Sequence, residues 1–112
     1  MNYDKAHELA REIRASDEFK RYKVAKEAIK EGSSSEAFIA EYRRLRLVAQ
    51  ADMVAGQSDE ETLEKLQRLG ELLQMDRDAS EYLMAEFALS RLVGDVYRIV
   101  ANAAELDISM LE

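Results

Sequence analysis

His7 is the only histidine in the chain, and Glu8 follows it, which is how the helical zinc sites of many hydrolases begin. Those sites need a second histidine four residues after the first, so that two imidazoles lie on one helix face and bind the metal. Arg11 stands at that position here. One histidine also cannot supply the two Glu-x-x-His pairs of a di-iron helical bundle. We therefore interpret His7 as an ordinary side chain of a first helix.

Carboxylates are the other abundant residues that can do chemistry. Asp76 and Asp78 are spaced like the first two ligands of a calcium-binding loop. The sixth position of such a loop is a glycine that allows a sharp turn, and Glu81 stands there instead. Phe87 takes the twelfth position, where a bidentate glutamate belongs. The sequence therefore does not predict a calcium site.

Composition excludes further classes of site. The chain has no cysteine, so it has no disulfide, no thiol nucleophile and no cysteine-ligated zinc or iron–sulfur cluster. No glycine-rich phosphate-binding motif is present either. We expect no catalytic residue, no cofactor and no metal. The alternative is an enzyme that uses its carboxylates with a divalent cation.

The elements that position these residues are predicted to be helices. The chain has 112 residues, 47% of them apolar and 35% charged, with four glycines and no proline. This apolar content is typical of a folded chain, and the absence of proline favours long helices. No segment alternates polar and apolar residues as a strand does. We predict an all-α fold, an elongated bundle of about five helices in a single domain, residues 1–112.

Helix boundaries are predicted from capping residues. Ser16 is expected to cap the second helix, and Gly32 and Gly56 to end the second and third helices. Three later helices are each expected to begin at a capping box, in which a glutamate follows the cap residue by three positions. These pairs are Ser33 with Glu36, Ser58 with Glu61, and Asp78 with Glu81. The inward side of the fourth helix is expected to consist of Leu63, Leu66, Leu69 and Leu73.

The last predicted helix, about residues 79–104, is the longest and has a wide apolar stripe. At about 1.5 Å per residue it spans roughly 39 Å, whereas a compact chain of about 100 residues has a radius of gyration of only about 13 Å. Its flanks then need a second chain to cover them, which predicts a homodimer joined through the last and third helices. Glu86 is either a specificity element there or pairs with an arginine between helices. The candidate interface consists of Tyr82, Glu86, Leu89, Leu92, Val93 and Val96.

Charge is unevenly distributed along the chain. Residues 1–56 have 11 basic and 10 acidic side chains, whereas residues 57–112 have 5 basic and 13 acidic ones. Arg43, Arg44 and Arg46 lie close together and form either a solvated face or a docking patch for an acidic surface, on a second copy or on another protein. The net charge of −7 disfavours direct nucleic-acid binding. Without a long apolar run or a signal-like start, we expect no membrane contact and a cytoplasmic location.

Three stretches of the sequence resemble the YlbF/YmcA/YheA family of small helical bacterial proteins: His7–Phe19, Tyr82–Glu86 and Leu92–Val96. The resemblance covers nearly the whole chain. It implies an all-helical, dimeric, non-enzymatic regulator of competence, sporulation and biofilm formation. Some members join a complex that directs the endoribonuclease RNase Y in mRNA processing and hold iron–sulfur clusters through cysteines. This chain has no cysteine, so cluster binding does not carry over.

Two functions follow as expectations. The first is a regulatory adaptor that acts through protein–protein contacts, with partners in an RNA-processing complex. The alternative is a self-assembling structural oligomer of helices, which would form a stable assembly without a further partner.

Overall fold

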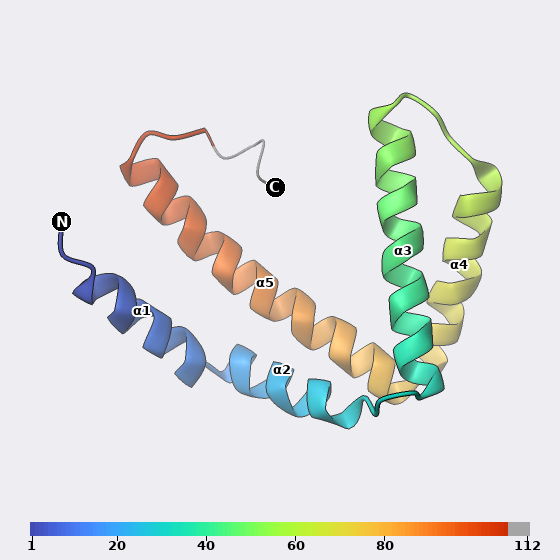
Figure 1. Cartoon of the computed structure of the whole chain (residues 1–112), viewed down its shortest axis with the longest axis horizontal. Helices are drawn as coiled ribbons and strands as arrows, with labels where there is room; N and C mark the ends of the chain where they lie inside the picture. The colour runs from blue at the N-terminus through green and yellow to red at the C-terminus, as the bar shows by residue number, and fades with distance from the viewer. Residues whose placement is uncertain (108–112) are drawn as a thin grey trace. The chain divides into compact units, whose positions relative to one another are not determined.

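The computed structural model describes residues 1–107, and the last five residues of the predicted domain lie outside this range. The described chain forms five helices and no strand (Figure 1). The helices are α1 (Asp4–Ala15), α2 (Asp17–Ala28), α3 (Ser34–Val54), α4 (Glu60–Met75) and α5 (Arg77–Ala103). The predicted all-α class and number of helices are confirmed, whereas the dimer stays a prediction.

Residue contacts divide the chain into two compact units. Ala25–Leu83 forms one, which we name the hairpin unit after its two central helices. Met1–Val24 and the described residues from Met84 onward form the other, the terminal unit. Helices α2 and α5 contribute residues to both units. The single domain therefore stays a prediction, and each unit is described by itself.

The core of the hairpin unit lies where α3 packs against α4, which returns antiparallel to it (Figure 1). Ile39 and Leu45 of α3 are buried, together with Leu69 and Leu73 of α4. Leu69 and Leu73 were predicted to point inward, and this is confirmed. The same prediction is wrong for Leu63, because half of its surface is exposed in the first turn of α4.

Ser16 and Ser33 begin helices as predicted. The Ser16 hydroxyl accepts a hydrogen bond from the backbone N–H of Phe19, over 3.2 Å. The Ser33 hydroxyl accepts one from the N–H of Glu36, also over 3.2 Å. The Glu36 carboxylate bonds the N–H of Gly32 instead of that of Ser33, because the Ser33 N–H already donates to the carbonyl of Lys30. The first capping box is therefore present, but the Glu36 carboxylate accepts from the residue before the cap residue and not from the cap residue itself.

The other two predicted capping boxes are wrong. Asp59, not Ser58, begins α4, and its carboxylate accepts hydrogen bonds from the Glu61 N–H and the Thr62 hydroxyl, both over 3.0 Å. Asp76, not Asp78, accepts from the Ala79 N–H at the start of α5, over 3.1 Å. Aspartate is among the best N-cap residues, and its negative charge is favourable beside the positive end of a helix dipole.

Gly56 ends α3 as predicted. Its φ of +73° is the left-handed conformation that glycine adopts without steric cost. The Gly56 N–H donates to the carbonyl of Met53, and the Gln57 N–H donates to that of Asp52, which together form a Schellman motif. The prediction for Gly32 is only half right. It has a φ of +77°, but α2 already ends at Ala28 and Gly32 lies in the turn that follows.

Candidate functional site

Arg43 and Tyr82, which the sequence assigned to two different surfaces, contact each other within the hairpin unit. Arg43 of α3 donates a hydrogen bond from Nη2 to the Tyr82 hydroxyl, over 3.0 Å. Its guanidinium carbon also lies 5.4 Å from the centre of the Tyr82 ring, within range of a cation–π interaction. Only 8% of the surface of Tyr82 is exposed. Tyr82 is thus packed in its own chain, and its role in an interface stays a prediction.

The other two arginines of the predicted docking patch also have partners in their own helix. Arg44 forms an ion pair with Glu41, and its hydrogen bonds hold the pKa of the Glu41 carboxyl below its usual value. The Arg46 guanidinium carbon lies 5.8 Å from the centre of the Tyr42 ring. Successive residues of a helix diverge by about 100°, so Arg44 points to a different side from Arg43. The docking patch remains a prediction.

The rest of the candidate interface on α5 belongs to the terminal unit. Glu86, Leu89, Leu92 and Val96 are half-buried there, and Val93 is 45% exposed. Tyr97 and Val100, which are not part of the candidate interface predicted from the sequence, are 48% and 57% exposed. They follow Val93 by four and seven residues, so all three lie on one side of α5. We call Val93, Tyr97 and Val100 the α5 strip; this spacing was the signal in the sequence.

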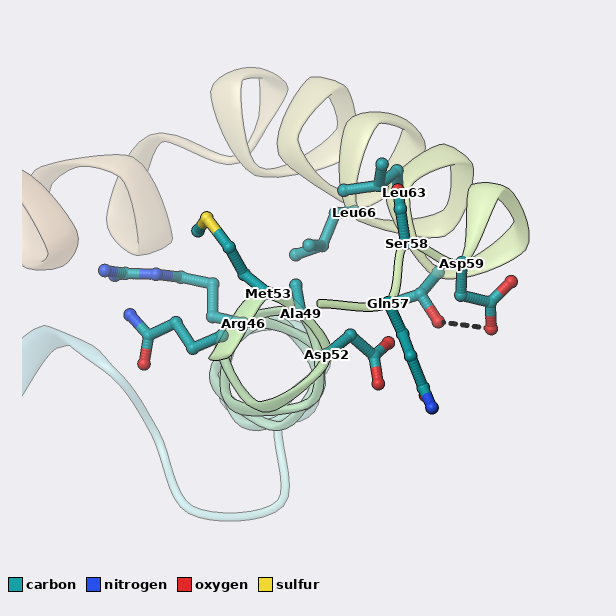
Figure 2. Close-up of a pocket in the computed structure, with 11 residues that line it drawn as sticks. Arg46, Ala49, Asp52, Met53, Gln57, Ser58, Asp59, Leu63 and Leu66 are labelled. Carbon is teal, nitrogen blue, oxygen red and sulfur yellow. Dashed lines mark hydrogen bonds between the residues drawn. The ribbon is translucent and has the colours of Figure 1, made fainter. Parts of the chain in front are cut away.

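A groove of about 320 Å³ opens between the last turns of α3 and the first turns of α4 (Figure 2). Its floor is apolar and consists of Ala49, Met53, Leu63 and Leu66. Figure 2 shows Met53 pointing from α3 toward α4 and Leu66 pointing back toward α3. The remaining lining residues are polar or charged: Arg46, Gln50, Asp52, Gln57, Ser58, Asp59 and Thr62. We name this feature the α3–α4 groove.

A second hollow of about 280 Å³ lies elsewhere in the hairpin unit. Ile39 and Ala40 provide apolar surface, and the Arg43–Tyr82 pair forms part of its wall. Lys26, Ile29 and Glu36 complete the lining. Sequence reasoning found neither hollow, because each is made by helices that come together only in the folded chain.

Within residues 1–107, no three histidine, aspartate or glutamate side chains are grouped so that they could hold a metal ion. His7 is an exposed side chain of α1. None of the five described helices is both long enough and apolar enough to cross a bilayer.

Residues 1–107 form a small, all-helical fold, and comparison with known proteins defines the family. Residues 2–105 match the family described as control of competence regulator ComK, YlbF/YmcA. The chain belongs to this YlbF/YmcA family, as its resemblance in three stretches indicated.

Relatives match the chain over nearly its full length. A UPF0342 protein of Symbiobacterium thermophilum is 38% identical over 95% of this chain and 96% of its own length. A UPF0342 protein of Clostridium novyi is 36% identical over 94% of this chain and 93% of its own. A Bacillus stearothermophilus protein of unknown function has a similar structure, with a TM-score of 0.73. That likeness covers 92% of this chain and 91% of the other at 22% identity, so it supports the fold alone.

Proposed function

We propose that this protein is a regulatory adaptor that acts by binding other proteins and not by catalysis. The observation that carries the proposal is membership of the YlbF/YmcA family over residues 2–105, whose description links it to the control of a competence regulator. The relatives at 36–38% identity match over nearly their whole length, so the family likeness covers these proteins almost completely.

The proposed partner is a protein of the RNA-processing machinery, the class that the resemblance to YlbF and YmcA implies. The α5 strip supports a contact with a protein, because tyrosine and aliphatic side chains exposed together on one helix side are typical of interfaces. Three neighbouring residues of the candidate interface are half-buried and would pack behind the exposed α5 strip: Leu89, Leu92 and Val96. The adaptor is proposed to work without an iron–sulfur cluster, since the chain has no cysteine.

The test uses the tagged full-length chain, expressed in its own host in place of the untagged copy. Val93→Asp with Tyr97→Asp places two charges in the α5 strip. Asn102→Asp, nine residues after Val93 and exposed on the opposite side of α5, is the matched control. We expect wild type and control to copurify with proteins of the RNA-processing complex, identified by mass spectrometry, and the strip variant to lose them. Circular dichroism checks that each variant is folded.

A functional readout accompanies the purification. Mapping of transcript ends in a deletion strain is expected to show altered mRNA processing, restored by wild type and by Asn102→Asp but not by the strip variant. Normal transcript ends in the deletion strain would overturn the adaptor role. Together with a stable assembly that captures no other protein, that result would favour the structural oligomer instead.

A further inference from the structure

The second hollow of the hairpin unit combines positive charge with apolar surface, and we name it the Arg43 hollow. Its volume is about 280 Å³, and its lining comes from the end of α2, from α3 and from the second turn of α5. Small-molecule sites in proteins are concave and begin at about 300 Å³. The Arg43 hollow is therefore close to the size that holds one small molecule.

Two cations from different helices line the Arg43 hollow. Lys26 belongs to the last turn of α2 and Arg43 to α3, so only the fold brings them to one site. The hydrogen bond to Tyr82 and the position over its ring hold the Arg43 guanidinium in place. A guanidinium has five N–H donors in a planar fork, so it can bind a carboxylate and keep its bond to Tyr82. A donor that is held in place before binding loses less conformational entropy when a ligand arrives.

Glu36 is the one carboxylate among the described lining residues. It accepts a hydrogen bond from the Gly32 N–H over 3.2 Å. Glu36, Ala40 and Arg43 follow one another by four and three residues, so they lie on one side of α3. Seven residues separate Glu36 from Arg43, which is about 10 Å along the helix axis. The hollow thus has a net positive charge, in a chain whose net charge is −7.

Apolar side chains provide the rest of the lining. Ile39 is 5% exposed and Ile29 is half-buried, so both belong to the packed part of the hairpin unit. Ala40 has a small side chain that leaves room beside them. Apolar ligand groups are favourably removed from water against such a surface. A ligand that matches the lining has a carboxylate for the cations and an apolar group for the isoleucines.

We propose that the Arg43 hollow binds a small organic acid, in which a carboxylate is joined to an apolar group a few carbon atoms away. The carboxylate pairs with Arg43 and Lys26, and the apolar group packs against Ile29 and Ile39. The hollow lies within the hairpin unit, whereas the α5 strip belongs to the terminal unit. The proposal is therefore independent of the adaptor role.

Titration of the full-length chain, followed by the NMR shifts of its backbone amides, tests the class of ligand. The probe is 3-phenylpropionate, with an expected dissociation constant of about 1 mM or below. Acetate lacks the apolar group and 3-phenylpropanamide lacks the charge, so each should bind at least about fivefold more weakly. Equal binding of either compound, shifts confined to residues outside the lining, or a dissociation constant above about 20 mM for the probe would overturn the proposal.

Substitutions test the location of the site. Lys26→Gln removes one cation and Ala40→Leu fills the hollow, so each should weaken binding of 3-phenylpropionate about fivefold or more. The matched controls are exposed residues outside the lining: Lys23→Gln, one turn earlier on α2, and Ala51→Leu, about 16 Å further along α3. Both controls should bind within about twofold of wild type. Circular dichroism checks folding, and folded lining variants that bind like wild type would refute the assignment.

A peptide distinguishes a small acid from an acidic segment of another protein. Acetyl-Phe-Asp-amide presents a phenyl ring and a carboxylate on a peptide backbone. It is expected to bind more weakly than 3-phenylpropionate, because the hollow is at the small end of the range for ligand sites. Tighter binding of the peptide would show that the hollow accepts a protein segment. That result would overturn the small-acid proposal and leave the adaptor role to its own test.

Discussion

The Ser35 hydroxyl donates a hydrogen bond to the Asp76 carboxylate over 2.6 Å, across 41 positions of the sequence. The other oxygen of Asp76 accepts from the Ala79 N–H at the start of α5. One side chain thus links the first turn of α3 to the junction of α4 and α5 within the hairpin unit. The bond from Ser35, followed by that from Ala79, holds the pKa of the Asp76 carboxyl below its usual value.

Ser35→Ala is expected to destabilise the chain at neutral pH by about 1 kcal/mol, through the loss of this hydrogen bond. Because the folded-state pKa of Asp76 is lowered, its contribution is present above the unfolded pKa, about 3.9, and is lost as the pH falls through the folded value. The difference between wild type and variant should therefore shrink in acid. Urea unfolding at pH 7 and near pH 2.5 measures it. An equal difference at both pH values would contradict the prediction.

Asp59→Ala is expected to cost about 1 kcal/mol of stability, since it removes the cap of α4 and leaves the Glu61 N–H without its carboxylate. Ser58→Ala is the neighbouring control, and its stability should stay within about 0.5 kcal/mol of wild type. Urea unfolding of the two variants compares the observed cap with the one that the capping-box pattern indicated. A larger loss for Ser58→Ala would reverse our assignment.

Tyr82→Phe removes the hydroxyl that accepts from Arg43 but keeps the ring, so it should cost about 1 kcal/mol. Combined with Arg43→Met in a double-mutant cycle, it should show a coupling free energy of roughly 0.5–1.5 kcal/mol. Chemical denaturation of the four proteins gives this value. Additive effects of the two substitutions would mean that the bond contributes nothing to stability.

Gly56→Ala and Gly70→Ala should change stability in opposite directions. Gly56 has a φ of +73°, where a Cβ costs about 1 kcal/mol or more, so alanine is destabilising. Gly70 lies inside α4, and beyond its chain neighbours and the adjacent helix backbone no atom lies within 4 Å of an added Cβ, so alanine should stabilise by about 0.5–1 kcal/mol. Thermal unfolding should move the melting temperature down for the first and up for the second. A rise for Gly56→Ala would contradict the role of its left-handed conformation, and a fall for Gly70→Ala would contradict the prediction for α4.

Capping shows how far sequence reasoning reached. Ser16, Ser33 and Gly56 were identified correctly, because each acts on backbone groups only a few residues away. Ser58 and Asp78 were wrong by one and two positions, because the carboxylates of Asp59 and Asp76 accept from N–H groups in the first turns of α4 and α5 instead. Asp76, and not Asp78, caps α5. Asp76 also accepts a hydrogen bond from the Ser35 hydroxyl, and this contact depends on how α3 packs against α4.

The sequence by itself determined that this protein is helical, where α2 and α3 begin, where α3 ends, and which family it belongs to. Those properties depend on apolar spacing and on capping within a turn or two, so residues close together in the sequence determine them. Only the tertiary structure decided that Arg43 meets Tyr82, that Ser35 meets Asp76, and that α3 and α4 enclose a groove. These features join residues far apart in the sequence, and the side-chain packing that brings such residues together is not encoded in any one segment.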